Sequence, residues 1–354
     1  MHLARSVKDP DIATRGMNGG PVLIAYCSSA AHYSYLKTAK LLGIGSNNLR
    51  QVPCDPITAE MNSTVLLALI LKDIENGGVP FFIGSTAGTT VVGGYDNFVE
   101  INKICQKYNI WHHVDACWGG GALLSSKIRH PCCQGIEKSQ SISWNPHKML
   151  GCALQTSIFL VSGTGDKLKQ ANGTHASYLF QPDKLFTEYD VGDKTIQCGR
   201  KTDSIKIWMM WKSLGDSGFA STIERCYSLH QYMINAMKKK PKRYVFVVPP
   251  SCTNICFWYV PLKLRTEMEG KELFDPLIHL EDKERRGMLH GVAPRIKAAM
   301  QMQGGAMIGF QTDETVRNGD INFFRMVFSS CDTVEEEDVD ATMRDIERVG
   351  ESIL

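Results

Sequence analysis

The feature that most constrains the fold is a pair of strand-like segments, each leading to a charged side chain. The segment 110–115 ends at Asp115, and the segment 141–144 runs into the tetrapeptide NPHK, which ends at Lys148. The two charged residues are separated by roughly 30 positions, about one βαβ unit. Because α/β proteins bind ligands at the carboxyl ends of parallel strands, we expect this carboxylate and this amine to lie side by side.

An amine beside a carboxylate at such a position has a specific chemical use. Lysine forms a Schiff base with an aldehyde, and an aspartate pairs with a protonated pyridine nitrogen; pyridoxal 5′-phosphate (PLP) requires both groups. Either residue alone would be an ordinary cap or a solvated charge. His147 beside the lysine and the small residues 119–121 after the aspartate support the pairing. The sequence therefore predicts a PLP site.

Strand-like and helix-like segments alternate through the first two-thirds of the chain. This alternation is typical of an α/β fold with a mostly parallel sheet. Strands are predicted at 21–26, 80–85, 110–115, 141–144 and 154–161. Helices are predicted at 35–42, 65–75 and 97–108. Regular structure then fades between about 163 and 200, and a loop of that length in a compact domain is usually functional.

The pattern changes beyond this loop. A helix is predicted at 205–214, and a long helix begins at Ser217. The remaining predicted elements are strands at 245–248, 254–259 and 322–329 and a helix at 285–302. This order indicates a smaller α+β domain. We therefore expect a large cofactor-binding domain over residues 1–210 and a small domain over residues 211–354.

Charge and cysteine content exclude several classes of function. The net charge of +2 gives no electrostatic case for a nucleic-acid partner or a membrane surface. The 12 cysteines are scattered, and their spacings suit neither a disulfide framework nor a zinc site. No secretory signal and no membrane-spanning run is recognisable. We therefore expect reduced thiols, no metal and a cytoplasmic protein.

Short motifs occur along nearly the whole chain in the order found in one family. They are HYS at 32–34, TAGTT at 86–90, HVDA at 113–116, NPHK at 145–148, SYLFQ at 177–181, GDK at 192–194, CGR at 198–200 and NFFR at 322–325. With them the chain resembles the group II PLP-dependent amino-acid decarboxylases, in the branch that acts on acidic amino acids. The resemblance implies the aspartate aminotransferase-like fold, fold type I.

The resemblance also implies roles for the residues that would hold PLP. Lys148 would bind the cofactor as an imine, Asp115 would keep its ring nitrogen protonated, and His32 would stack on the ring. Thr86 would bond to the cofactor or to Asp115. The remaining candidate cofactor contacts are Ala116, Cys117 and Asn145 near the ring and His147 at the phosphate.

Three further residues are candidates for work on the substrate. Arg325 would bind the substrate α-carboxylate, because a guanidinium matches a carboxylate with two hydrogen bonds. Arg200 is a second, weaker candidate for an anion. Tyr178 lies in the long irregular segment, which in the family resembles a mobile loop that closes over the neighbouring subunit's site. It would protonate the α-carbon after decarboxylation.

The implied function is α-decarboxylation of an acidic amino acid by a homodimer with its active sites at the interface. Motifs 86–88 and 119–121 resemble glutamate decarboxylases, whereas 42–45 and 177–178 resemble the cysteine sulfinate and aspartate enzymes. We favour cysteine sulfinate or aspartate and keep glutamate open. Relatives carry on the order of a hundred further residues before the position of Met1.

Two alternatives remain open at this point. Without the amino-terminal part, the chain would be a catalytically impaired subunit that acts as a non-catalytic partner. A weaker alternative is a cysteine-dependent hydrolase with Cys117 as the nucleophile. Because consecutive strand residues point to opposite faces, only His113, and not His112, would share a face with that thiol.

Overall fold

The structure is a computed structural model with side chains. It describes residues 1–163, 166–174, 176, 178–181, 183, 185–187, 190–197, 199, 202–266, 283–316 and 320–353, with positions 130 and 131 described by their backbone alone. Arg200 and Ser177 therefore lie outside the described residues. Within these ranges, every helix is too short or too polar to cross a lipid bilayer.

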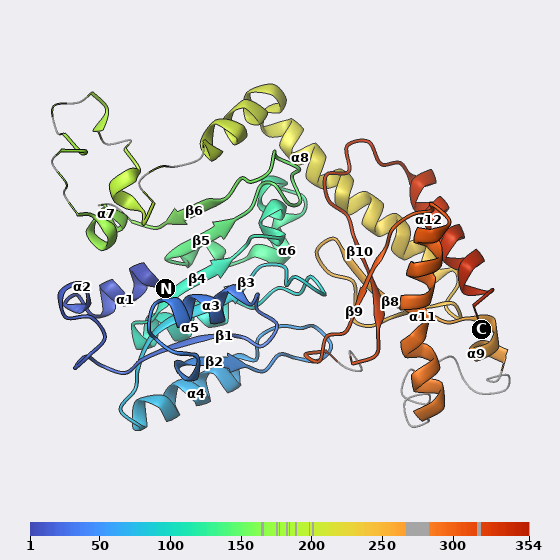
Figure 1. Ribbon diagram of the computed structural model, residues 1–354, viewed down its shortest axis with the longest axis horizontal. Coiled ribbons are helices and arrows are strands. Elements are labelled where there is room, and N and C mark those ends of the chain that lie inside the picture. The colour runs from blue at the N-terminus through green and yellow to red at the C-terminus, as the bar shows by residue number, and fades with distance from the viewer. Residues whose placement is uncertain are drawn as a thin grey trace.

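A six-stranded sheet forms the centre of the amino-terminal part (Figure 1). In spatial order its strands are β2 (Leu49–Val52), β1 (Leu23–Ser28), β3 (Val79–Thr86), β4 (Trp111–Asp115), β5 (Ser141–Trp144) and β6 (Ile158–Val161). The first five strands are parallel and β6 is antiparallel to β5. The carboxyl ends of β3, β4 and β5 therefore meet at one edge, as the sequence predicts.

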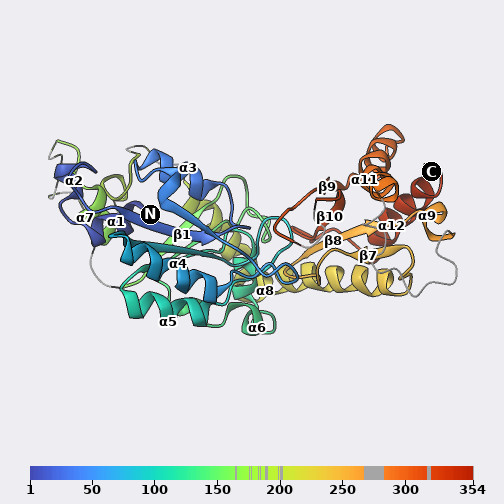
Figure 2. The same cartoon turned by 90° about the horizontal axis from the view of Figure 1, so that it is seen from below.

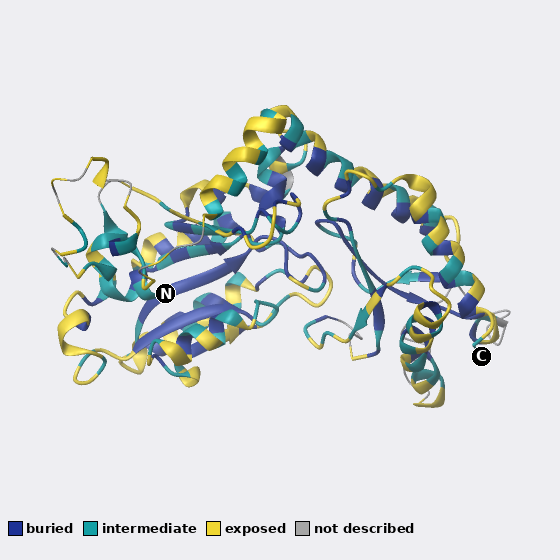
Figure 3. Ribbon diagram, turned by 45° about the horizontal axis from the view of Figure 1, so that its top comes forward, coloured by how far each residue is buried: buried dark blue, intermediate teal, exposed yellow. Residues whose placement is uncertain are grey.

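Helices cover both faces of this sheet, so its central strands are buried on both sides. Helices α4 (Ser63–Glu75) and α5 (Phe98–Tyr108) pack on one face, and α1 (His2–Lys8) and α3 (Ser34–Leu41) pack on the other (Figure 2). Figure 3 shows the central strands in the dark blue of buried residues. A strand buried on both faces needs a continuous apolar run, and β1 is buried at every position.

Local signals in the sequence fix where α4 and α5 begin. The side chain of Asn62 accepts a hydrogen bond from the backbone N–H of Val65, and Asn97 accepts one from Glu100. These bonds satisfy N–H groups that the first turn of a helix leaves free. Three shorter helices complete this part of the chain, namely α2 (Ile12–Arg15), α6 (Arg129–Cys133) and α7 (Lys167–Asn172).

Helix α8 (Asp203–Lys238) connects the central sheet to the carboxyl-terminal part. Its backbone is non-helical at Gly215, where φ is 66°. The two helices predicted at 205–214 and from Ser217 onward are therefore the two halves of α8. The predicted domain boundary after residue 210 falls inside its first half and stays a prediction.

The carboxyl-terminal part is built on a second, antiparallel sheet. Its spatial order is β7 (Tyr244–Phe246), β8 (Asn254–Tyr259), β10 (Phe323–Val327) and β9 (Gly309–Gln311). Helices α9 (Leu262–Thr266), α11 (Lys283–Met302) and α12 (Glu336–Gly350) accompany it (Figure 1). Apolar side chains of α8, α11, α12 and the sheet form one buried cluster.

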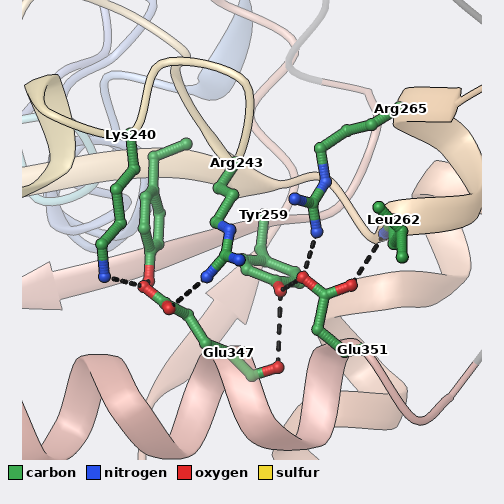
Figure 4. Close-up of polar contacts among 8 residues, drawn as sticks. Lys240, Arg243, Tyr259, Leu262, Arg265, Glu347 and Glu351 are labelled. Carbon is green, nitrogen blue, oxygen red and sulfur yellow. Dashed lines mark hydrogen bonds and ion pairs between the residues drawn. The ribbon is translucent and has the colours of Figure 1, made fainter.

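Glu347, near the end of α12, connects this helix to the start of the second sheet (Figure 4). The Glu347 carboxylate lies 2.6 Å from Lys240 Nζ and accepts a 2.9 Å hydrogen bond from the hydroxyl of Tyr244. It also pairs with Arg243. Because the Tyr244 ring is buried, its hydroxyl depends on this carboxylate for a partner.

The structure corrects two details of the predicted elements. The strand predicted at 154–161 begins only at Ile158, because the preceding residues form a turn closed by the 2.7 Å hydrogen bond from Thr156 Oγ1 to the carbonyl of Ala153. The segment 163–200 contains α7 as well as irregular chain. The other predicted strands and helices match observed elements, with ends that differ by a few residues.

Candidate active site

A cavity of about 340 Å³ opens at the carboxyl ends of β3, β4 and β5. This volume lies in the range of small-molecule sites. Asp115 and Lys148 both line it, so the structure brings together the two groups that the sequence singled out. The other described residues in its lining are Met1, His32, Ser34, Tyr35, Thr38, Phe82, Thr86, Gly88, Thr90, His113, Cys117, Trp118, Ser143 and Asn145.

Asp115 is the last residue of β4 and is held by the strands on either side. It is paired with Thr86 of β3 and with Ser143 of β5. The backbone N–H of Cys117 donates a 3.0 Å hydrogen bond to Asp115 Oδ1, and the Ser143 hydroxyl lies 3.5 Å from the same oxygen. A carboxylate has about four acceptor positions, so capacity remains for an N–H donor in the cavity.

Lys148 sits in a tight turn directly after β5. Its backbone N–H donates to the carbonyl of Asn145 at 3.0 Å, and the N–H of Cys152 donates to Pro146 at 3.1 Å. The ring of His147 is pinned on the far side of this turn, where Nδ1 lies 3.1 Å from the nitrogen of Thr156. These contacts fix the backbone that carries the lysine at the mouth of the cavity.

The TAGTT segment, residues 86–90, forms part of the cavity lining. Asp96 holds the start of this segment in place. This buried carboxylate accepts 2.7 Å hydrogen bonds from the backbone N–H groups of Thr86 and Met61. Burial raises the pKa of Asp96 to about 7. Gly88 has φ of +81°, and a Cβ there would lie 2.9 Å from the backbone nitrogen of Gly119. Only glycine allows this approach.

The donor and acceptor set of the cavity fits PLP. The hydroxyl of Thr86 is buried and has no hydrogen-bond partner among the described residues, although it lines the cavity. Native proteins satisfy buried polar atoms, so such an atom at a cavity wall is a position for a ligand contact. The Asp115 carboxylate, which has acceptor capacity left, the Lys148 amine and the half-buried ring of His32 line the same space. These are the groups that the cofactor needs.

Three other predicted site residues are not in the described lining of this cavity. Ala116 is fully buried beside it, and His147 faces Thr156; neither belongs to the described lining. Arg325 Nε donates a 3.1 Å hydrogen bond to the carbonyl of Val91, which follows the cavity residue Thr90. The roles predicted for these residues stay predictions.

Tyr178 and Arg200 belong to the irregular segment after β6. The Tyr178 side chain is 83% exposed and lies beside a different hollow, which includes Phe180 and Asp193. It is therefore not brought to the Lys148 cavity of its own chain. Arg200 is outside the described residues, and its predicted role cannot be placed. Neither prediction is tested by this arrangement.

The cysteine-hydrolase alternative meets a chemical obstacle. Cys117 and His113 do share the cavity, with the Ser143 hydroxyl 3.5 Å from the thiol and 3.4 Å from His113 Nε2. Burial and the neighbouring Asp115 raise the pKa of Cys117 to about 12, and burial lowers the pKa of His113 to about 4. A nucleophilic cysteine needs a lowered thiol pKa, so the surroundings of Cys117 do not support this hypothesis.

Sequence reasoning missed several residues of the lining. Ser143 was detectable, because it lies on β5, the strand that leads to Lys148, and is the residue there that pairs with Asp115. Phe82 and His113 also follow the two-residue period of their strands. Tyr35 gave no such signal, because it reaches the cavity from α3, across the face of the sheet.

Comparison with known proteins identifies the family. Residues 4–260 match the model of the pyridoxal-dependent decarboxylase conserved domain. The chain belongs to this family. It is 40% identical over its full length to the acidic amino acid decarboxylase GADL1 of Bos taurus and 40% identical to that of Mus musculus. The crystal structure of mouse CSAD superposes with a TM-score of 0.89 at 36% identity, covering 100% of this chain and 69% of that one.

Membership in the pyridoxal-dependent decarboxylases confirms the predicted family, fold class and cofactor. The observed sheet, with five parallel strands and an antiparallel edge, agrees with fold type I. The chain spans 64% of the bovine relative and 60% of the mouse relative, less than two thirds of either.

Proposed function

We propose that this protein is a PLP-dependent decarboxylase of an acidic amino acid. The observation that carries the proposal is the single cavity lined by Lys148 and Asp115 at neighbouring strand ends. Membership in the pyridoxal-dependent decarboxylases and the 40% identity to relatives named acidic amino acid decarboxylases support it.

The chain's own residues divide the work within the cavity. When bound, PLP supplies an aldehyde that condenses with amines and a ring that withdraws electrons from the substrate α-carbon. Lys148 provides the amine that holds this aldehyde between turnovers. The Asp115 carboxylate accepts the N–H of the ring nitrogen and stabilises its positive charge. His32 would help to hold the ring, and the hydroxyl of Thr86 would bond to the cofactor or to Asp115.

Arg325 is the proposed partner of the substrate α-carboxylate. Its Nε donates a hydrogen bond to the carbonyl of Val91, the residue after Thr90 of the cavity lining, which supports this role. We favour cysteine sulfinate or aspartate over glutamate as the substrate. The likeness to relatives named acidic amino acid decarboxylases supports an acidic amino acid as the substrate, and the choice among the three rests on motifs 42–45 and 177–178.

We further propose that two copies of the chain assemble and that Tyr178 serves the partner's cavity. Tyr178 is exposed and lines a hollow other than the cavity of Lys148 in its own chain. Much of the first half of α8 is exposed (yellow in Figure 3). Its exposed apolar side chains include Trp208 and Met209, each 61% exposed. A contiguous exposed apolar surface is typical of an assembly interface. Tyr178 would then donate the proton to the α-carbon.

The location of the protein is a separate proposal. Each cysteine within the described ranges is a free thiol. Free thiols in this number are typical of a reducing compartment, and we infer that the protein is cytoplasmic.

The test combines cofactor capture with product analysis. Purified protein is loaded with PLP, reduced with borohydride and digested, and the cofactor mass should appear on the peptide that contains Lys148. Lys148→Ala should abolish the adduct, whereas Lys127→Ala, at an exposed lysine, should retain it. Aspartate, cysteine sulfinate and glutamate supplied together should yield the amine of one of them. A borohydride adduct in Lys148→Ala would refute the site. Cofactor capture without any amine product would favour the non-catalytic partner.

A further inference from the structure

Tyr35 carries a buried hydroxyl for which no use has been assigned. The residue is only 7% exposed and lines the cavity of Asp115 and Lys148. Its hydroxyl has no hydrogen-bond partner within the described part of the chain. A phenylalanine would fill the same volume without burying a polar atom, so the hydroxyl is a cost to the folded chain unless something in the cavity uses it.

A gap in the sheet accommodates this side chain. A Cβ atom at Gly84 would lie 2.3 Å from Tyr35 Cε1 and 2.7 Å from its hydroxyl, so the ring rests directly on the backbone of β3. Gly84 is paired with His113, and Thr86 follows it on the same face of the strand. The hydroxyl therefore lies beside Gly84, two residues before the carboxyl end of β3 at Thr86, which pairs with Asp115.

The charges around the hydroxyl keep it a donor. Burial, and after it the Asp115 carboxylate, raise the pKa of Tyr35 well above its usual value. The hydroxyl is therefore protonated at any physiological pH. A neutral donor near the carboxylate end of a ligand cavity suits an acceptor that arrives with the ligand.

Tyr26 provides an internal comparison. It lies on the neighbouring strand β1, is fully buried, and donates a 2.9 Å hydrogen bond to Asp73 Oδ2. The described part of the chain therefore supplies a partner for the buried hydroxyl of Tyr26 and none for that of Tyr35, which lines the cavity.

We propose that Tyr35 is a positioning residue for the cofactor. Its hydroxyl donates a hydrogen bond to an acceptor oxygen that PLP brings into the cavity, on its ring hydroxyl or its phosphate. The inference rests on the proposed function, because it requires PLP in this cavity. It assigns a cofactor contact to α3, an element from which the motifs supply none.

The test compares Tyr35→Phe with Tyr26→Phe in two measurements. The first is the urea midpoint of the cofactor-free protein, and the second is the dissociation constant for PLP from absorbance titration. Tyr35→Phe should keep or raise the midpoint, because it removes an unsatisfied buried group. It should weaken PLP binding roughly three- to tenfold, the value of one hydrogen bond. Tyr26→Phe should lower the midpoint and leave the dissociation constant unchanged.

The outcomes separate this inference from the proposed function. PLP binding that is equal in wild type and Tyr35→Phe would overturn the role of Tyr35 and leave the decarboxylase proposal intact. A marked fall in the midpoint of Tyr35→Phe would also overturn it, because the hydroxyl would then have a partner within the chain. If wild type binds no PLP at all, both proposals fail together.

Discussion

A buried histidine beside the site makes the stability of this protein depend on pH in a calculable way. His112 on β4 lies between Ser85 and Asn102, with its Nε2 2.7 Å from the serine hydroxyl and its Nδ1 2.7 Å from the amide oxygen of Asn102. The order serine, histidine, amide is that of a nucleophilic triad. All three residues are buried, the most exposed at 3%, so no substrate reaches the hydroxyl and the chain of bonds is structural.

The magnitude follows from the pKa of the ring. Burial lowers the pKa of His112 to about 3 from its ordinary 6.5. Between these values the unfolded chain binds a proton that the folded chain does not, so stability rises with pH up to about 6.5 and falls as the pH drops below it. Lowering the pH from about 7.5 to about 5 should cost roughly 2 kcal/mol through this group alone.

The assay must isolate His112 from other buried groups. The lowered pKa values of His113 and His230 act in the same direction, whereas the raised pKa of Asp96 acts in the opposite one. We therefore compare urea unfolding of wild type and His112→Gln at several pH values, since the other groups cancel in the difference. Glutamine keeps a donor and an acceptor but does not titrate.

Wild type should lose about 2 kcal/mol more than His112→Gln between about pH 7.5 and 5. His290→Gln, at an exposed histidine, serves as the control and should follow the wild-type curve. Identical pH dependence in wild type and His112→Gln would refute the reasoning, because it would mean that the buried ring is charged or accessible.

Two further substitutions test the carboxyl-terminal part and the cavity wall. Glu347→Gln should lower the free energy of unfolding by about 1–3 kcal/mol, because charge-assisted bonds to the carboxylate weaken. Urea unfolding checks this. An unchanged midpoint would show that the bonds of the Glu347 carboxylate contribute nothing to stability. Gly88→Ala should cost more stability than Gly45→Ala. Both glycines have positive φ, but only the Cβ at Gly88 meets backbone. Equal losses in urea unfolding would contradict this explanation.

The sequence predicted the positions that are defined by strand ends. Asp115 and Lys148 were placed at one edge from spacing and alternation alone, and they line one cavity. The break at Gly215 agrees with the prediction of one helix at 205–214 and another from Ser217 onward. These features are local in the chain, so the periods of strand and helix are enough to find them.

Asp96 shows what such periods do not reveal. It lies just before α5, yet its carboxylate fixes both Thr86 at the cavity and Met61 before α4. A lone aspartate before a helix is an ordinary cap in sequence. Its burial, and therefore the raised pKa, depends on three segments that come together only in the fold.

Tyr35 and Gly84 show the same limit at the site itself. A tyrosine in the first turn of a helix and a glycine inside a buried strand are separately unremarkable, and a strand glycine even weakens the strand. They form one feature because the ring of Tyr35 occupies the space that a side chain at Gly84 would fill. Any substitution at Gly84 should therefore displace the Tyr35 ring toward the cavity and disturb Asp115 as well. A mutational scan of the strand would attribute the resulting disturbance of the site to β3, although the displaced side chain belongs to α3.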